Sequence, residues 1–138
     1  MSFVIDASVA MSWFFEDEQT PQILNLLREV SRDGCVVPSL WRLEIANVLQ
    51  MGIKRKRIDG GFRDAAIRRL SNLPIEIDPE TDAQAWTATL RLADVHRITT
   101  YDACYLELAV RRKFSLATRD MELAAAAGNA GVMLLPTS

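Results

Sequence analysis

The sequence has one histidine, two cysteines and no long hydrophobic run among its 138 residues. No apolar stretch approaches the roughly 20 residues that a transmembrane helix needs. The N-terminus also lacks a basic region followed by an apolar stretch of signal-peptide length. We therefore expect a cytoplasmic protein without a membrane span or an export signal.

The scarcity of cysteine and histidine also argues against disulfides and zinc. Cys35 and Cys104 lie among apolar residues, which favours buried free thiols in a reducing compartment over a disulfide framework. The two cysteines are too far apart to form a local zinc motif. His96 is the only histidine, and a surface or capping position near the end of a helix explains it better than a role as a base. Aspartate and glutamate are left as the candidate ligands of any metal ion.

Hydrophobic residues make up 49% of the chain and charged residues 25%, as in soluble globular proteins. A chain of this length suits one domain with a substantial core, so we expect a single domain over residues 1–138. No internal repeat or long linker interrupts it. The net charge of −2 excludes a surface that binds polyanions everywhere.

Basic residues are nevertheless concentrated in one stretch. Residues 42–69 contain eight lysines and arginines but only three acids. A local basic patch can bind phosphates even on an acidic protein, which makes the densest part a candidate for binding RNA: Lys54, Arg55, Lys56 and Arg57. Taken alone, the patch is better explained as a solvated helix end, because lysine and arginine favour the last turn of a helix.

Short apolar runs alternate with helical patterns along the chain. Strands are expected at residues 3–5, 35–37, 74–77, 115–118 and 132–135. Helices are expected at residues 7–15, 20–33, 39–55, 64–73, 79–93, 99–113 and 120–127. Trp41 and Trp86 fall in the apolar stripes of their predicted helices, so both are expected in the core. The alternation predicts an α/β fold with a mainly parallel sheet, although it does not predict the strand order.

Four acids occupy positions that surface acids rarely take. Asp6 directly follows the apolar strand 3–5, and Asp120 follows the strand 115–118 in the same way. Asp102 falls on the apolar stripe of its predicted helix, and Glu44 falls on the flank of another. Ligands bind at the carboxyl edge of open α/β sheets, so all four acids could face one binding site.

Each acid also has a simpler explanation. Asp102 could be stabilised by the N-terminus of its helix, and Asp120 could cap the next helix. Glu44 could pair with Arg42 or with a distant arginine. Four such acids in one small domain favour a shared site instead. Their mutual repulsion would raise their pKa values unless a cation is present, and oxygen ligands suit Mg²⁺ or Mn²⁺. Ser8 and Thr118 are candidates for orienting water or the carboxylates.

Four short motifs then resemble those of PIN-domain ribonucleases, and most of all the VapC-type toxins of prokaryotic toxin–antitoxin pairs. The motifs are Ile5-Asp6-Ala7-Ser8, Leu43-Glu44-Ile45-Ala46-Asn47-Val48-Leu49, Tyr101-Asp102-Ala103-Cys104-Tyr105 and Leu116-Ala117-Thr118-Arg119-Asp120. Their order and spacing match the family over essentially the whole chain.

The resemblance implies a three-layer α/β/α sandwich and Mg²⁺- or Mn²⁺-dependent endonucleolytic cleavage of RNA. By position it places Asp6, Glu44, Asp102 and Asp120 on the acidic residues of the family, as metal ligands and catalytic residues. It also implies a homodimer and a small antitoxin that wraps the toxin and blocks the cleft.

Three alternatives stay open at this point. A phosphotransfer domain would want a second aspartate at Ser8, or a lysine near Asp120, and the sequence has neither. A non-catalytic RNA-binding module would not need all four acids. A housekeeping RNA-processing nuclease would share the chemistry but lack an antitoxin.

Overall fold

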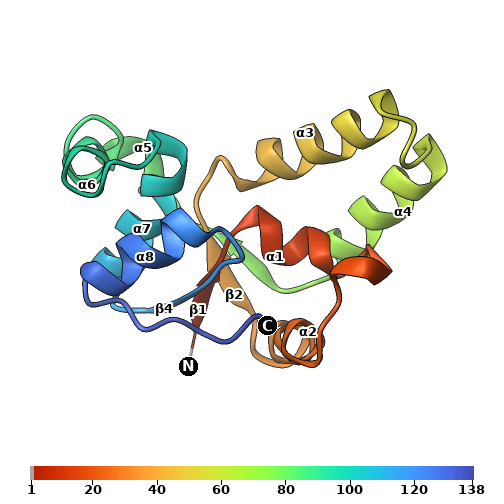
Figure 1. Cartoon of the computed structure of the whole chain (residues 1–138), viewed down its shortest axis with the longest axis horizontal. Helices are drawn as coiled ribbons and strands as arrows, with labels where there is room; N and C mark the ends of the chain where they lie inside the picture. The colour runs from red at the N-terminus through yellow and green to blue at the C-terminus, as the bar shows by residue number, and fades with distance from the viewer. Residues whose placement is uncertain (1) are drawn as a thin grey trace.

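A computed structural model of the chain describes residues 2–138, within which the four-stranded sheet is wholly parallel. The spatial order of the strands is β3-β2-β1-β4. Their bounds are β1 (Phe3–Ile5), β2 (Cys35–Val37), β3 (Ile75–Ile77) and β4 (Ser115–Ala117). Helices flank the sheet in the layered α/β arrangement of Figure 1, which confirms the predicted fold class.

The helices complete the fold on both sides of the sheet. Their bounds are α1 (Ala7–Ser12), the 3₁₀ turn η1 (Glu16–Glu18), α2 (Pro21–Asp33), α3 (Trp41–Lys54), α4 (Gly60–Ser71), α5 (Thr81–Gln84), α6 (Ala88–His96), α7 (Thr100–Arg112) and α8 (Met121–Asn129). Figure 1 shows that α3 and α4 form a pair that leads away from α7 and α8.

The central position of β1 determines where a ligand can bind. Within the sheet, β2 and then β3 lie on one side of β1, and the last strand, β4, lies on its other side. Ile5 is the register partner of Ala117, so the carboxyl ends of β1 and β4 lie side by side. In open parallel sheets, the crevice at such a reversal of strand order is the usual ligand site. Asp6 and Thr118 are the residues that follow these two strands.

The central strands are buried because other elements cover both faces of the sheet. Every residue of β1 and β2 is buried, as expected for central parallel strands. Trp41 is buried as predicted.

The helix predicted over residues 79–93 is wrong, because the structure contains two short helices there. Thr87, with φ −120° and ψ −93°, lies outside the helical region and separates α5 from α6. Helical periodicity does not continue through this break, so Trp86 is 89% exposed instead of lying in the core.

Three other predicted elements also differ from the structure. Residues 132–135 form only an isolated parallel bridge between Leu134 and Leu116, and not a strand. Helix α4 begins at Gly60, earlier than expected, because Asp59 caps it by accepting a hydrogen bond of 2.8 Å from the Phe62 N–H. Helix α3 begins at Trp41, two residues later than expected, and the Ser39 N–H donates to Thr81 Oγ1 at 3.1 Å.

No helix within residues 2–138 is both long enough and apolar enough to cross a bilayer.

Candidate functional site

Asp6 is the buried centre of the candidate site, with only 5% of its surface exposed. It caps α1, and its Oδ1 accepts hydrogen bonds from Ser8 Oγ at 2.6 Å and from the Val9 N–H at 3.2 Å. Its Oδ2 accepts a hydrogen bond from Thr118 Oγ1. Burial raises the pKa of Asp6, although these hydrogen bonds lower it, and the nearby charge of Asp120 raises it further.

Ser8 and Thr118 join the ends of β1 and β4 through Asp6. Ser8 Oγ also accepts a hydrogen bond of 3.0 Å from the Arg119 N–H. Thr118 Oγ1 accepts one of 3.0 Å from the Asp120 N–H. Both hydroxyls therefore donate to the Asp6 carboxylate while they accept from the backbone beyond β4, which holds that carboxylate in one orientation.

Asp120 and Asp102 lie at the first turns of α8 and α7. Asp120 caps α8, as the simpler interpretation expected, because its Oδ1 accepts a hydrogen bond of 3.0 Å from the Leu123 N–H. Asp102 is half-buried, and burial raises its pKa to about 6. The charges of Asp120, Asp6 and Glu122 contribute to the same rise, so these acids lie within electrostatic range of one another.

Glu44 reaches the site from the first turn of α3. Its Oε1 accepts a hydrogen bond from the hydroxyl of Tyr105 on α7. Burial raises the pKa of Glu44, the Tyr105 hydrogen bond lowers it, and the charges of Asp102 and Asp6 raise it again.

The structure therefore brings all four predicted acids into one electrostatic neighbourhood, which we call the acidic cluster: Asp6, Glu44, Asp102 and Asp120. Among the described residues, none of the four forms a salt bridge with lysine or arginine. The predicted pairing of Glu44 with Arg42 is absent from the same set. Uncompensated negative charge on partly buried carboxylates is costly, and a cation would relieve that cost.

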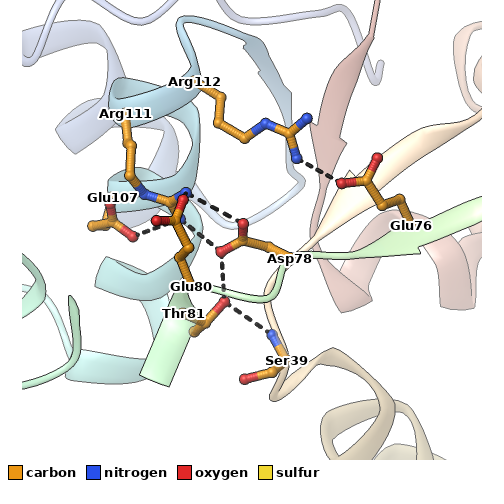
Figure 2. A network of polar contacts seen from close by, with 8 residues as sticks. All are labelled: Ser39, Glu76, Asp78, Glu80, Thr81, Glu107, Arg111 and Arg112. Atoms are coloured by element: carbon orange, nitrogen blue, oxygen red, sulfur yellow. Dashed lines mark hydrogen bonds and ion pairs between the residues drawn. The ribbon is translucent and has the colours of Figure 1, made fainter. Parts of the chain in front are cut away.

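An acid at the end of the edge strand β3 shows how a buried carboxylate is neutralised elsewhere in this fold. Asp78 follows β3 and is buried, yet Figure 2 shows it facing Arg111, whose Nη2 lies 2.6 Å from Asp78 Oδ2. Burial alone would raise the pKa of Asp78, but hydrogen bonds from Arg111 and Thr81 leave it lowered. Asp6 follows β1 directly, as Asp78 follows β3, but among the described residues no arginine pairs with Asp6.

The acidic cluster has the right donor atoms for a hard divalent cation, but its side chains are not arranged around one. All its donors are carboxylate oxygens, which suit Mg²⁺ or Mn²⁺. In the part of the chain that the structure describes, however, no three acidic, histidine or cysteine side chains stand close enough to hold one metal ion together. Glu44, Asp102 and Asp120 are all partly or largely exposed, so burial does not fix their side chains in one position.

The predicted RNA-binding residues do not lie beside the acidic cluster. Lys54 ends α3, and at about 1.5 Å per residue it lies roughly 15 Å along the helix axis from Glu44. Arg57 is engaged within the protein, since its Nη2 lies 3.3 Å from both Asp17 Oδ1 and Glu18 Oε2. Lys54 therefore lies well away from Glu44 along α3, and Arg57 is paired with two acids outside the acidic cluster.

The sequence analysis did not predict the roles of two residues near the acidic cluster. Arg119 is the nearest arginine in the chain to Asp120, and its Nη1 donates to Ser12 Oγ at 2.9 Å and to the Glu18 carbonyl oxygen at 2.6 Å. Tyr105 entered the sequence analysis only as part of the motif around Asp102. A phenol hydroxyl on a buried stripe needs a hydrogen-bond acceptor, and that requirement was the signal that could have identified it.

Comparisons with known proteins point to one family. The family model described as PIN domain matches residues 3–129. A comparison with curated protein sequences finds no significant match.

Several solved structures share the fold. PAE2754 from Pyrobaculum aerophilum is 23% identical, with a TM-score of 0.71 over 98% of this chain and 84% of that one. VapBC2 from Rickettsia felis, bound to a DNA fragment from its promoter, is 11% identical, with a TM-score of 0.66 over 97% of each chain. A toxin–antitoxin complex from Klebsiella pneumoniae is 15% identical, with a TM-score of 0.64 over 99% of this chain and 100% of that one.

Proposed function

The chain belongs to the PIN-domain family, and on this basis we propose that it is a Mg²⁺- or Mn²⁺-dependent endoribonuclease that acts as the toxin of a toxin–antitoxin pair. The observation that carries the proposal is the acidic cluster around the carboxyl ends of β1 and β4. It combines a buried carboxylate with three more accessible acids, and among the described residues no lysine or arginine pairs with them.

Asp6 provides the fixed point of the proposed metal site. Ser8 and Thr118 hold its two carboxylate oxygens. Oδ1 also accepts the Val9 N–H, so Oδ2 is the oxygen that keeps a lone pair for a cation. Asp102, Glu44 and Asp120 supply the remaining protein oxygens after side-chain rotation. All four residues act as proposed metal ligands, and Ser8 and Thr118 act by orienting Asp6.

The charge of the acidic cluster makes the divalent cation necessary for an RNA substrate. A phosphodiester is itself negative, so the unneutralised carboxylates would repel it. A bound Mg²⁺ would lower the pKa of a water nucleophile and stabilise charge on the leaving oxygen. Lys54, Arg55 and Lys56 are exposed and can hold the RNA backbone only at a distance from the cleaved bond.

The proposed partners come from the family resemblance and from the solved structures of the same fold. One of those structures is a toxin–antitoxin complex and another is VapBC2. We therefore include an antitoxin protein, a homodimer and a cytoplasmic location in the proposal.

The decisive experiment measures RNA cleavage by protein purified free of any partner. Cleavage should require Mg²⁺ or Mn²⁺, stop with a chelator, and be lost in Asp6→Asn and Asp102→Asn. Asp94→Asn is the matched control, because Asp94 is an exposed acid on α6 outside the acidic cluster. Unchanged cleavage in both cluster variants would remove these acids from the mechanism.

Two other outcomes would redirect the proposal. RNA binding without cleavage under any divalent metal would indicate a non-catalytic module. Cleavage without growth arrest on expression, and with no upstream antitoxin reading frame, would indicate a housekeeping RNA-processing nuclease.

A further inference from the structure

Tyr105 has one specific polar partner in the structure. Its side chain is only 1% exposed, and its hydroxyl donates to Glu44 Oε1. A buried phenol must place its proton on an acceptor, and water does not reach this one freely. In the described part of the chain, this is the only hydrogen bond that joins α7 to α3. The partners are 61 residues apart in sequence, so the contact depends on the tertiary fold.

Glu44 needs such a contact to stay near the acidic cluster. It is half-exposed, it forms no salt bridge among the described residues, and the charges of Asp102 and Asp6 disfavour its ionised form at this position. A glutamate with three rotatable side-chain bonds would relieve that repulsion by turning toward solvent. The hydrogen bond from Tyr105 opposes this movement.

The contact also leaves Glu44 available to a cation. Tyr105 uses Oε1, and Oε2 accepts no hydrogen bond within residues 2–138. Asp102 and Tyr105 lie three residues apart on α7, so one rigid helix positions Asp102 directly and Glu44 through the phenol. Carboxylates that bind metals are commonly held in this way by a neighbouring donor.

We propose that Tyr105 is a positioning residue that holds Glu44 in the acidic cluster so that one of its carboxylate oxygens can bind the divalent metal ion. This inference rests on the proposed metal-dependent function. It extends that function to a residue outside the acids, and it gives Glu44 the same kind of support that Ser8 and Thr118 give Asp6.

The chain offers a matched pair of variants, because its only two tyrosines both lie on α7. Tyr105→Phe removes the buried hydroxyl and keeps the ring. Tyr101→Phe removes a hydroxyl from a side chain that is 65% exposed. The dissociation constant of Mn²⁺ is measured for each protein at one fixed pH by titration calorimetry, with thermal unfolding recorded in parallel.

Tyr105→Phe should weaken Mn²⁺ binding about 10-fold, as is typical when a residue that orients a ligand is lost. Tyr101→Phe should leave the dissociation constant unchanged. In a Glu44→Gln background, Tyr105→Phe should cause little further loss, because the two residues act through one contact.

Two results would overturn the inference, and they distinguish its failure from that of the proposed function. If the wild type binds Mn²⁺ but Tyr105→Phe binds it equally well while unfolding at a lower temperature, Tyr105 only stabilises the core. If the wild type binds no divalent metal, the proposed function fails together with this inference.

A measurement on the wild type keeps the test valid even if Tyr105→Phe fails to fold. The hydroxyl proton of Tyr105 should give an NMR resonance that shifts when Mg²⁺ saturates the protein, because Mg²⁺ would bind the carboxylate that accepts this proton. A resonance that does not respond to saturating Mg²⁺ would overturn the positioning role.

Discussion

Asp6 accepts a hydrogen bond from Thr118, which lies 112 residues further along the chain. The contact joins the two strand ends at the reversal of strand order, between β1 and β4. It also satisfies one oxygen of a buried carboxylate that no arginine neutralises in the described structure. The stability of the fold and the orientation of the acidic cluster therefore depend on the same hydroxyl.

Replacing Thr118 by valine should destabilise the protein by about 1–3 kcal/mol at pH 7, because Asp6 Oδ2 would lose its donor in a buried site. Valine keeps the branched shape of threonine, so packing changes little. Urea unfolding measures the effect, with Thr100→Val as the control at an exposed position. Equal stability of Thr118→Val and wild type would show that this hydrogen bond contributes no net stability.

Metal-free protein should lose stability as the pH rises from about 4 to about 7 through the titration of Asp102. Its pKa is raised from 3.8 to about 6 in the folded state, so the folded form binds this proton more tightly than the unfolded form does. The stabilising contribution is complete below the unfolded pKa and is lost as the pH passes the folded pKa.

Asp102→Asn isolates this contribution from other titrations, such as that of Asp78, whose lowered pKa acts in the opposite direction. In the presence of a chelator, the melting temperature of Asp102→Asn should exceed that of wild type at pH 8, and the two should converge at pH 4. Parallel melting curves at both pH values would contradict the assignment.

Divalent metal should stabilise the wild type at pH 8 and have little effect at pH 5, where Asp102 is largely protonated. A ligand at about 100 times its dissociation constant adds about 2.7 kcal/mol to the free energy of unfolding. Melting curves with Mn²⁺ and then with excess chelator check this shift and its reversal. Asp94→Asn should keep the shift and Asp6→Asn should lose it. An equal shift in all three proteins would place the metal elsewhere.

The buried ion network of Figure 2 should matter far more for stability than the exposed pair beside it. Arg111 contacts Asp78 and Glu107, whose side chains are both almost fully buried, so Arg111→Met should cost about 3–5 kcal/mol. Arg112 pairs with the exposed Glu76, so Arg112→Met should cost less than about 1 kcal/mol. Chemical denaturation of the two variants compares them directly, and similar losses would contradict the distinction.

The sequence was most informative where the local signal was strong. The strands at residues 3–5 and 35–37 were predicted because parallel strands buried on both faces appear as short apolar runs. Acids that follow such runs were equally visible. The structure places Asp6 directly after β1 and Asp120 three residues after the adjacent strand β4, at the N-cap of α8. The roles of these acids in metal binding and catalysis stay predictions.

Features that depend on tertiary contacts were not predictable in the same way. The strand order had no local signal, and the partner of Tyr105 is chosen by the packing of α7 near α3. Trp86 was misplaced because periodicity alone does not reveal a backbone break at Thr87. The strand predicted at residues 132–135 failed because a single bridge at Leu134 is too little pairing to form one.

The strand order β3-β2-β1-β4 also has a consequence for synthesis of the protein. The first strand made is the central one, and one of its two neighbours, β4, is the last of the four to be translated. A nascent chain on the ribosome therefore cannot complete the acidic cluster around Asp6 until translation has passed Asp120. If the protein cleaves RNA, this order prevents activity from appearing before β4 and Asp120 have been made.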